Sequence, residues 1–515
     1  MMMVTGFIIA SLILVIVFVY MNRKKSNEQG KAIPHYSGWP VIGMALDINV
    51  SNSIYKFDEM VKRSGHIFSV NMCGKTMVVL NSADLLRKAF SSEQYAKYFN
   101  DRPKSSYPRF FRPSGDSLGY TLQASDPMFK LQKKTMIRAI HAYGSGIQKL
   151  EDKVLAEMEN VLNKIENMET KEFDCSAFLQ RSLSNIISLI LVGKMIPDGD
   201  PDENLPWQKT DATDYFASPI IDTILTALPS LRLLPFTTLG NKYRESLEIT
   251  RRIADKFFYS IEKKDYGDDD DGGIVQFYLE EQRKEKMVGG DTVFTDERIV
   301  SQILETIEAG VITTWSALTN SMLILVNHPE CQLKLQKEFD EVIGDGRWPR
   351  ISDRSQCHYF MAYEKEVHRY TPLAPTLIPH VCNDNVLLEG YNVQKDSVII
   401  GNLWYIHHDE KVWGDPWNFR PERFLDDNGH ILPPEHPYCR SIFPFGIGDR
   451  KCVGETFAKS RYFLYIATFM QHYNFEFPEG AKKPSCDPRN VKDFDCKLTL
   501  RAKPFIVHAI KRKLK

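Results

Sequence analysis

The chain has 515 residues, of which 43% are hydrophobic and 25% charged, and its formal net charge at pH 7 is −1. This balance is typical of a globular protein with a large core and excludes a disordered chain. The near-neutral charge offers no general attraction to nucleic acid, so we expect no nucleic-acid partner. Any membrane association must rest on local sequence.

The N-terminus carries an apolar run. Residues 4–21 hold no charge and come close to the shortest length that spans a bilayer as a helix. Three basic residues follow at once, and the positive-inside rule keeps the chain after them in the cytoplasm. A cleaved signal peptide is the alternative, but no clear small-x-small cleavage site precedes the basic cluster. We therefore expect a transmembrane anchor (1–21), a basic and Pro/Gly-rich linker (22–44) and one large domain (45–515).

Nine cysteines are scattered along the chain, and none forms a CxxC pair. An odd number of isolated cysteines fits free thiols in a reducing compartment better than a disulfide framework. The spacing also excludes a zinc ribbon.

The next patterns predict a helical domain with little sheet. Residues 67–80 read as a hairpin of two β-rich runs around Cys73-Gly74-Lys75, and residues from about 126 to 281 carry helical patterns. A long helix is expected over 294–326, with Thr295 in a capping position. A second helix over 329–343 follows, and short β-like runs come after Pro372. We expect a mainly α fold with a minor β portion.

A glycine-rich loop around Cys452 carries the strongest chemical signal. Residues 443–454 read FPFGIGDRKCVG, and a helix is expected to run from there to about His472. Glycines let the backbone approach a flat ligand closely. A thiolate at a helix N-terminus is stabilised by the helix dipole and by N–H groups. Arg450 stands where it could reach a carboxylate of such a ligand.

The pattern Phe445-x-x-Gly448-x-Arg450-x-Cys452-x-Gly454 resembles the haem-binding signature of the cytochrome P450 family. The resemblance covers nearly the whole chain after the anchor. It implies a cytochrome P450 fold preceded by one transmembrane helix. It also implies a haem (heme b) whose iron is axially ligated by Cys452. A buried free cysteine after a glycine loop is the alternative.

The resemblance extends to charged residues upstream of the loop. Glu366 and Arg369 lie on one helical face, and with Arg423 they are similar to the family's buried Glu-Arg-Arg network. That network is structural, because buried charges must be paired with one another. His407-His408 lacks the context of a metal site, so we interpret it as structural.

Haem propionates need cationic partners. The resemblance suggests Arg102, Lys133, His380 and Arg450 for this role. The family's Trp-x-x-x-Arg stands here as Phe129-x-x-x-Lys133, which is a departure. Lysine can pair with a propionate as a point charge but not as a fork.

Residues 309–314 (AGVITT) resemble the family's oxygen-activating segment, in which Ala309 and Gly310 line the oxygen groove and Thr313 supports protonation. The acid that normally precedes this threonine is replaced by Ile312. Glu308 lies about one turn earlier on nearly the same helical face. Two alternatives stay open: Glu308 serves proton delivery or grips a cationic substrate group, or it is a helix carboxylate with a structural partner.

The resemblance implies a monooxygenase that inserts one oxygen atom of O2 into a lipophilic small molecule, similar to the steroid 17-hydroxylase and xenobiotic-oxidising group. Its electrons would come from NADPH through a membrane-bound reductase, with cytochrome b5 as a further candidate partner. We expect a single-pass protein of the endoplasmic reticulum membrane. A basic cluster of Lys130, Lys133, Lys134 and Arg138 could steer the reductase or be a solvated helix face.

Two alternatives compete with this function. Ile312 is compatible with a non-oxygenase of the same fold, an isomerase or dehydratase, which would need no reductase. A tethered haem protein that senses or stores a ligand would turn over nothing.

Overall fold

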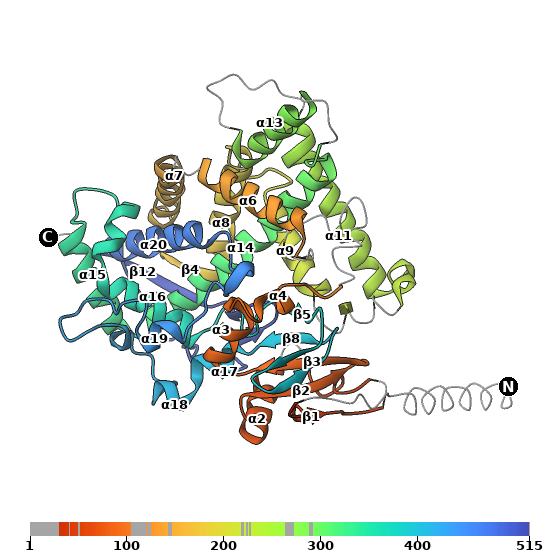
Figure 1. The fold of residues 1–515 in the computed structure, drawn as a ribbon. Helices are drawn as coiled ribbons and strands as arrows, with labels where there is room; N and C mark the ends of the chain where they lie inside the picture. The colour runs from red at the N-terminus through yellow and green to blue at the C-terminus, as the bar shows by residue number, and fades with distance from the viewer. Residues whose placement is uncertain are drawn as a thin grey trace. The chain divides into compact units, whose positions relative to one another are not determined.

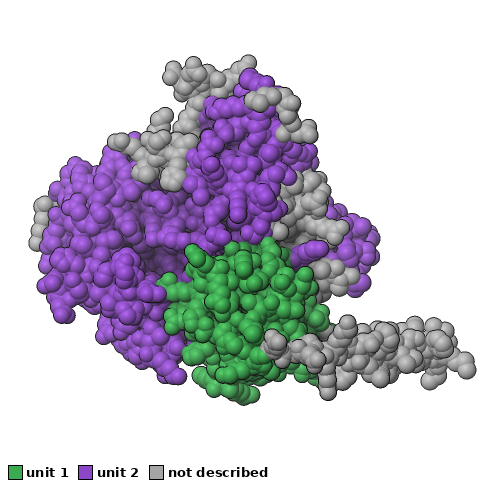
Figure 2. Space-filling model, viewed as in Figure 1, with its two compact units in different colours: residues 1–103, 376–402 green, residues 104–375, 403–515 purple. Residues whose placement is uncertain are grey.

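The computed structural model describes residues 30–40, 42–49, 52–104, 121, 125–142, 147–217, 221–222, 225, 228–262, 272–287 and 292–513. The chain forms two compact units, which Figure 2 shows in different colours. Unit 1 contains residues 1–103 and 376–402, and unit 2 contains residues 104–375 and 403–515.

Unit 1 is built on a mixed sheet in the order β1-β2-β3-β8-β5. Its strands and the separate pair β6–β7 are β1 (His35–Tyr36), β2 (Ile67–Met72), β3 (Lys75–Leu80), β5 (His380–Val381), β6 (Val386–Leu388), β7 (Tyr391–Val393) and β8 (Val398–Gly401). Its helices are α2 (Ser53–Ser64), α3 (Ala83–Ser91) and α4 (Ala96–Phe99).

The predicted hairpin is confirmed. Strands β2 and β3 pair antiparallel from Ile67↔Leu80 to Met72↔Lys75. The two residues between them, Cys73 and Gly74, have φ of 50° and 81°. Positive φ at both central residues is what a tight two-residue turn requires, and glycine adopts it without strain. Strand β8 then adds parallel to β3, so segments far apart in sequence share this sheet.

Unit 2 is mainly helical, as predicted (Figure 1). Its longer helices are α6 (Pro127–Ala142), α7 (Ile147–Glu166), α8 (Cys175–Val192), α9 (Leu205–Phe216), α11 (Thr238–Ala254), α13 (Gly273–Met287), α14 (Asp296–Asn327), α15 (Pro329–Val342), α16 (His358–Tyr370) and α20 (Glu455–His472). Short helices are η1 (Pro229–Leu233), η2 (Asp255–Tyr259), α12 (Ser260–Glu262), η3 (Ile351–Gln356), α17 (Leu403–His408), α18 (Glu410–Trp413), η4 (Pro421–Phe424), α19 (Pro437–Arg440) and η5 (Gly448–Arg450).

Two small sheets complete unit 2. One has the order β4-β12-β9 and the other is the pair β10–β11. Their strands are β4 (Glu172–Asp174), β9 (Tyr473–Glu476), β10 (Phe494–Cys496), β11 (Leu500–Ala502) and β12 (Ile506–Lys511).

Helix α14 is the central element of unit 2. The Thr295 side chain caps it by accepting from the Arg298 N–H, as the sequence predicted. The helix packs against α8, α9, α20 and strand β11, and most of its residues are buried. Pro329 then begins α15, and Gly344, with a φ of 77°, follows the end of that helix. The two expected helices are therefore confirmed.

Within the described residues, α8 and α14 are long and apolar enough to cross a membrane. Their most apolar windows are 78% and 83% buried inside the protein, which is typical of core helices. The anchor expected over 4–21 lies outside the described residues.

Candidate functional site

The Cys452 loop is closed by its own backbone. The Cys452 N–H donates to the Phe445 carbonyl at 2.9 Å, and η5 lies between the two residues. Gly446 and Gly448 have φ of 73° and 71°, so the turn needs glycine at both positions. Helix α20 begins three residues after Cys452, at Glu455, as the sequence indicated.

The Cys452 thiol lies in a recess. Its surface is exposed to solvent, yet protein surrounds it closely enough that burial raises the pKa of the thiol above its ordinary value. A hydrogen bond from the Gly454 backbone and the charges of Arg461 and Lys451 act in the opposite direction. Desolvation therefore outweighs the N–H group and the nearby cations.

The Glu366, Arg369 and Arg423 side chains form the expected network, and all three are fully buried. Arg369 binds Glu366 through two bonds of 2.7 Å, and Arg423 Nε lies 3.2 Å from the same carboxylate. Arg423 also pairs with Asp415 at 2.6 Å, which lowers the pKa of that carboxyl to about 2. Two carboxylates therefore balance two guanidinium groups.

His407 connects this network to the cysteine loop. Arg369 donates to the His407 carbonyl at 3.1 Å, and the His407 Nε2 accepts the Phe443 N–H at 3.1 Å. Burial, followed by the charge of Arg369, lowers the pKa of His407 to about 3. Because a neutral imidazole accepts through one nitrogen, burial keeps His407 in the form that can hold the loop. This supports the structural interpretation of His407.

Two of the predicted propionate partners meet in unit 2. Lys133 on α6 donates through Nζ to the Asp449 carbonyl. Burial is the main cause of the lowered pKa of the lysine. The Arg450 guanidinium stacks on the Phe129 ring at 3.6 Å from its centroid. Phe129, which replaces a tryptophan of the family pattern, thus supports Arg450 by a cation–π contact.

The other two predicted partners lie in unit 1. Arg102 donates through one nitrogen to the carbonyls of Ile378 and Pro379, at 2.7 and 2.9 Å. The His380 Nδ1 lies 2.6 Å from the Phe99 carbonyl, and its ring contacts Phe90. Backbone carbonyls therefore fix both side chains.

A strip of accessible residues interrupts the buried helix α14. Ala309 is exposed, and Glu308, Gly310 and Thr313 are half-buried, whereas most of the helix is buried. The Thr313 hydroxyl donates to the Ala309 carbonyl at 2.5 Å. A Cβ at Gly310 would lie 2.6 Å from Ile187 Cδ1 of α8, so glycine here permits close helix packing.

Ile312 is buried, with only 2% of its surface exposed. Glu308 pairs with Lys209 of α9 at 3.2 Å; the lysine side chain is fully buried and the glutamate 12% exposed. The structure thus gives Glu308 the structural partner of the second alternative, while the carboxylate keeps some access to the strip.

Arg461 was not anticipated from the sequence. It lies on α20 and is 2% exposed. It donates to the Gly310 carbonyl at 3.3 Å and to the Thr314 hydroxyl at 2.9 Å. The one signal in the sequence is an arginine that directly precedes the mainly apolar run 462–470.

The basic cluster of α6 divides into two sets. Lys130, Lys134 and Arg138 are exposed, whereas Lys133 turns to the cysteine loop. Arg138 is also paired with Glu281 at 3.2 Å. These contacts leave a narrower surface cluster than the sequence suggested.

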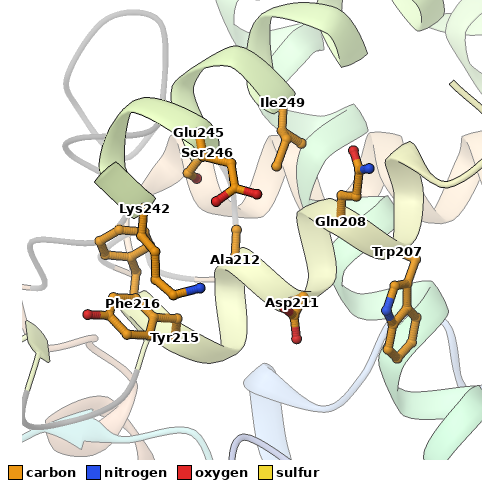
Figure 3. Close-up of a pocket in the computed structure, with 10 residues that line it drawn as sticks. All are labelled: Trp207, Gln208, Asp211, Ala212, Tyr215, Phe216, Lys242, Glu245, Ser246 and Ile249. Atoms are coloured by element: carbon orange, nitrogen blue, oxygen red, sulfur yellow. The ribbon is translucent and has the colours of Figure 1, made fainter. Parts of the chain in front are cut away.

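A small cavity of about 100 Å³ lies between α9 and α11 (Figure 3). Its lining includes Asp211, Glu245 and Lys242, whose ammonium lies 5.0 Å from the centroid of the Tyr215 ring. None of the predicted site residues lines it. We therefore place the candidate site at Cys452 and the α14 strip.

The described residues fit a haem. Cys452 offers an accessible thiol, Arg450 lies in the same loop, and Lys133 of α6 contacts that loop through the Asp449 carbonyl. Phe445, which begins the turn, packs against the His368 ring at 5.9 Å. The accessible strip of α14 is joined to α20 through Arg461. A cysteine sulfur for the iron and cations for the carboxylates are the groups that a haem needs.

The comparisons with known proteins agree with this geometry. The sequence model of the family described as Cytochrome P450 matches residues 34–508. The chain is 29% identical to the steroid 17-alpha-hydroxylase/17,20 lyase of Ictalurus punctatus, covering 88% of this chain and 87% of the relative. It is 28% identical to cytochrome P450 1A2 of Oryctolagus cuniculus, over 93% and 92% of the two chains. It is 26% identical to cytochrome P450 2D6 of Homo sapiens, over 87% and 88%.

Proposed function

Because the chain belongs to the cytochrome P450 family, whose members are haem-thiolate monooxygenases, we propose that Cys452 is the axial ligand of a haem iron in this protein. The enzyme inserts one oxygen atom of O2 into a lipophilic small molecule. The observation that carries the proposal is the accessible Cys452 thiol, held in a recess by the Phe445–Cys452 turn. When bound, the haem supplies the oxygen chemistry, and the thiolate pushes electron density toward O–O cleavage.

The cations near the loop hold the propionates in this proposal. Arg450 stays extended because Phe129 lies under its guanidinium, and Lys133 is held by the Asp449 carbonyl. Arg102 and His380 stay proposed for the same role, because the resemblance to the family suggests them. Charge-assisted hydrogen bonds of this kind are roughly twice as strong as neutral ones.

The accessible strip of α14 delivers protons and admits oxygen in this proposal. Ala309 and Gly310 line the groove, and the Thr313 hydroxyl, anchored on the Ala309 carbonyl, is the proton donor of this strip. Ile312 cannot carry a proton, so we assign the acid function to Glu308. Glu308 lies 3.2 Å from Lys209, and its side chain is 12% exposed.

Electrons come from NADPH through a membrane-bound cytochrome P450 reductase, with cytochrome b5 as a second donor. The exposed set Lys130, Lys134 and Arg138 of α6 provides a positive surface for an acidic partner. Residues 4–21 anchor the enzyme in the endoplasmic reticulum membrane, with the catalytic domain in the cytoplasm. The lipophilic substrate reaches the site from that membrane.

One alternative has a specific observation in its favour. Ile312 is buried and occupies the position of the usual acid, so an isomerase or dehydratase acting on a substrate with an O–O or N–O bond is the second candidate function. Such an enzyme would turn over without NADPH or reductase. A monooxygenase would need both.

The test is the absorbance of the dithionite-reduced, carbon-monoxide-bound protein beside a Cys452→Ser variant. A Soret band strongly red-shifted from that of histidine-ligated haem, and absent from the variant, is the expected result. A protein that takes up no haem, or a band that the substitution leaves unchanged, would overturn the proposal.

A further inference from the structure

Arg461 is a buried guanidinium that no carboxylate balances. It is 2% exposed and stacks on Phe457 at 3.8 Å from the ring centroid. Its two hydrogen bonds go to neutral acceptors, the Gly310 carbonyl and the Thr314 hydroxyl. Its Nε has no hydrogen-bond partner in the described part of the chain.

The other buried cations of the described residues differ from Arg461 in having a carboxylate partner. Among the described residues, the remaining buried lysine and arginine side chains each pair with a carboxylate: Lys209 with Glu308, Arg369 and Arg423 with Glu366, and Arg501 with Asp214. In the same part of the chain, Arg461 forms no ion pair. A buried charge without a partner is costly, so a retained one needs an opposite charge from another source.

The position of Arg461 identifies that source. It lies on α20, the helix that follows Cys452, and its guanidinium contacts α14 at the oxygen-groove strip. It therefore joins the ligand loop to the groove. Burial lowers the pKa of Arg461 to about 9.

We propose that Arg461 is a positioning residue whose buried positive charge balances the negative charge gathered at Cys452, and whose hydrogen bonds fix the Gly310–Thr314 segment of α14. This inference rests on the proposed function. A cation held in a low-dielectric interior stabilises added negative charge more than one in water does. Arg461 therefore raises the reduction potential of the bound haem, because reduction adds an electron beside it.

The experiment is a spectroelectrochemical titration of the holoenzyme and three variants. Arg461→Gln removes the charge and keeps a polar side chain, and Arg461→Lys keeps the charge without the planar fork. Lys459→Gln is the matched control, because it removes a charge two residues earlier on α20 that is 34% exposed and neutralised by Glu455. We expect a lower potential in Arg461→Gln, and values near the wild type in Arg461→Lys and in the control.

Arg461→Met, which buries no polar atom without a partner, replaces the glutamine variant if that variant does not hold haem. Loss of haem from both neutral variants, with retention in Arg461→Lys, also supports the need for the charge. An unchanged potential in a neutral variant, or an Arg461→Lys variant that behaves like the neutral ones, would overturn the inference. Loss of haem from all three Arg461 variants would also overturn it, because shape and not charge would then be decisive.

The proposed function fails at an earlier step of the same experiment. If the wild-type protein shows no red-shifted carbon-monoxide band, the thiolate ligand is excluded before any potential is measured. If the band is present and the potential does not follow the charge at position 461, the inference on Arg461 alone is wrong.

Discussion

Two regions of unit 2 bury arginine side chains, and they do so in opposite ways. Around Glu366, two guanidinium groups are balanced by two carboxylates, and the remaining N–H groups donate to backbone carbonyls. At Arg461, one guanidinium donates to two neutral oxygens and has no carboxylate among the described residues. In the first arrangement carboxylates of the protein balance the charge, whereas in the second no carboxylate of the described residues does so.

This difference distinguishes the structural charges around Glu366 from the functional charge of Arg461. A balanced network locks segments together and has no reason to change during turnover. An unbalanced cation responds to any change in the charge beside it. We therefore expect substitutions around Glu366 to act on stability and substitutions at Arg461 to act on the haem.

The largest effect is expected for Glu366→Gln, which leaves Arg369 without a carboxylate, as Arg461 is, while Arg423 keeps its pair with Asp415. Breaking a buried ion pair by removing one partner costs about 3–5 kcal/mol. The free energy of unfolding, measured by urea titration of the holoenzyme, should fall by that amount. A variant as stable as the wild type would show that the protein tolerates unbalanced buried arginines in general, and the contrast with Arg461 would lose its meaning.

A smaller effect is expected for Lys209→Met, which removes the partner of a half-buried carboxylate. We expect a loss of about 2 kcal/mol, because Glu308 keeps some contact with solvent. The double variant Lys209→Met/Glu308→Gln should recover most of the lost stability. If Glu308 carries protons, the amount of substrate converted per reducing equivalent stays below the wild-type value in the double variant. Recovery of turnover along with stability would leave Glu308 a purely structural role.

The smallest effect is expected for His407→Leu, which leaves the Phe443 N–H without its acceptor. Such a loss costs about 1–3 kcal/mol near neutral pH. His407 has a folded pKa of about 3, below its ordinary value of 6.5, so the unfolded chain binds the proton first. Stability that His407 provides above pH 6.5 is therefore lost as the pH falls toward 3. The leucine variant should show a shallower decline in urea unfolding between pH 7 and 4, and an equal decline would contradict the burial of a neutral imidazole.

Most elements of the fold could be predicted from local sequence patterns. The hairpin at Cys73-Gly74, the cap at Thr295 and the glycine after α15 follow from short-range backbone chemistry, and all three lie where they were expected. Cys452 and the Glu366–Arg369 pair are equally local, because each depends on spacing within one loop or helix. The elements could therefore be predicted without knowledge of how the helices pack.

The partners of the site residues could not be predicted in this way. The pairing of Glu308 with Lys209 joins two helices that are about a hundred residues apart in sequence. The bond from Arg461 to Gly310 spans 151 residues. The pKa of Cys452 depends on desolvation by the surrounding protein, which its position near the start of a helix does not reveal. Long-range packing decides these properties.

The close approach of Gly310 to Ile187 has a consequence for how the sequence can change over time. Any side chain at position 310 would collide with the end of Ile187, 123 residues earlier in the chain. A lineage that shortens Ile187 first opens room for alanine at 310, whereas the reverse order passes through a crowded and less stable intermediate. The two positions are therefore expected to change together and in one order, so Ile187 of α8 constrains which residues can stand at position 310 of α14.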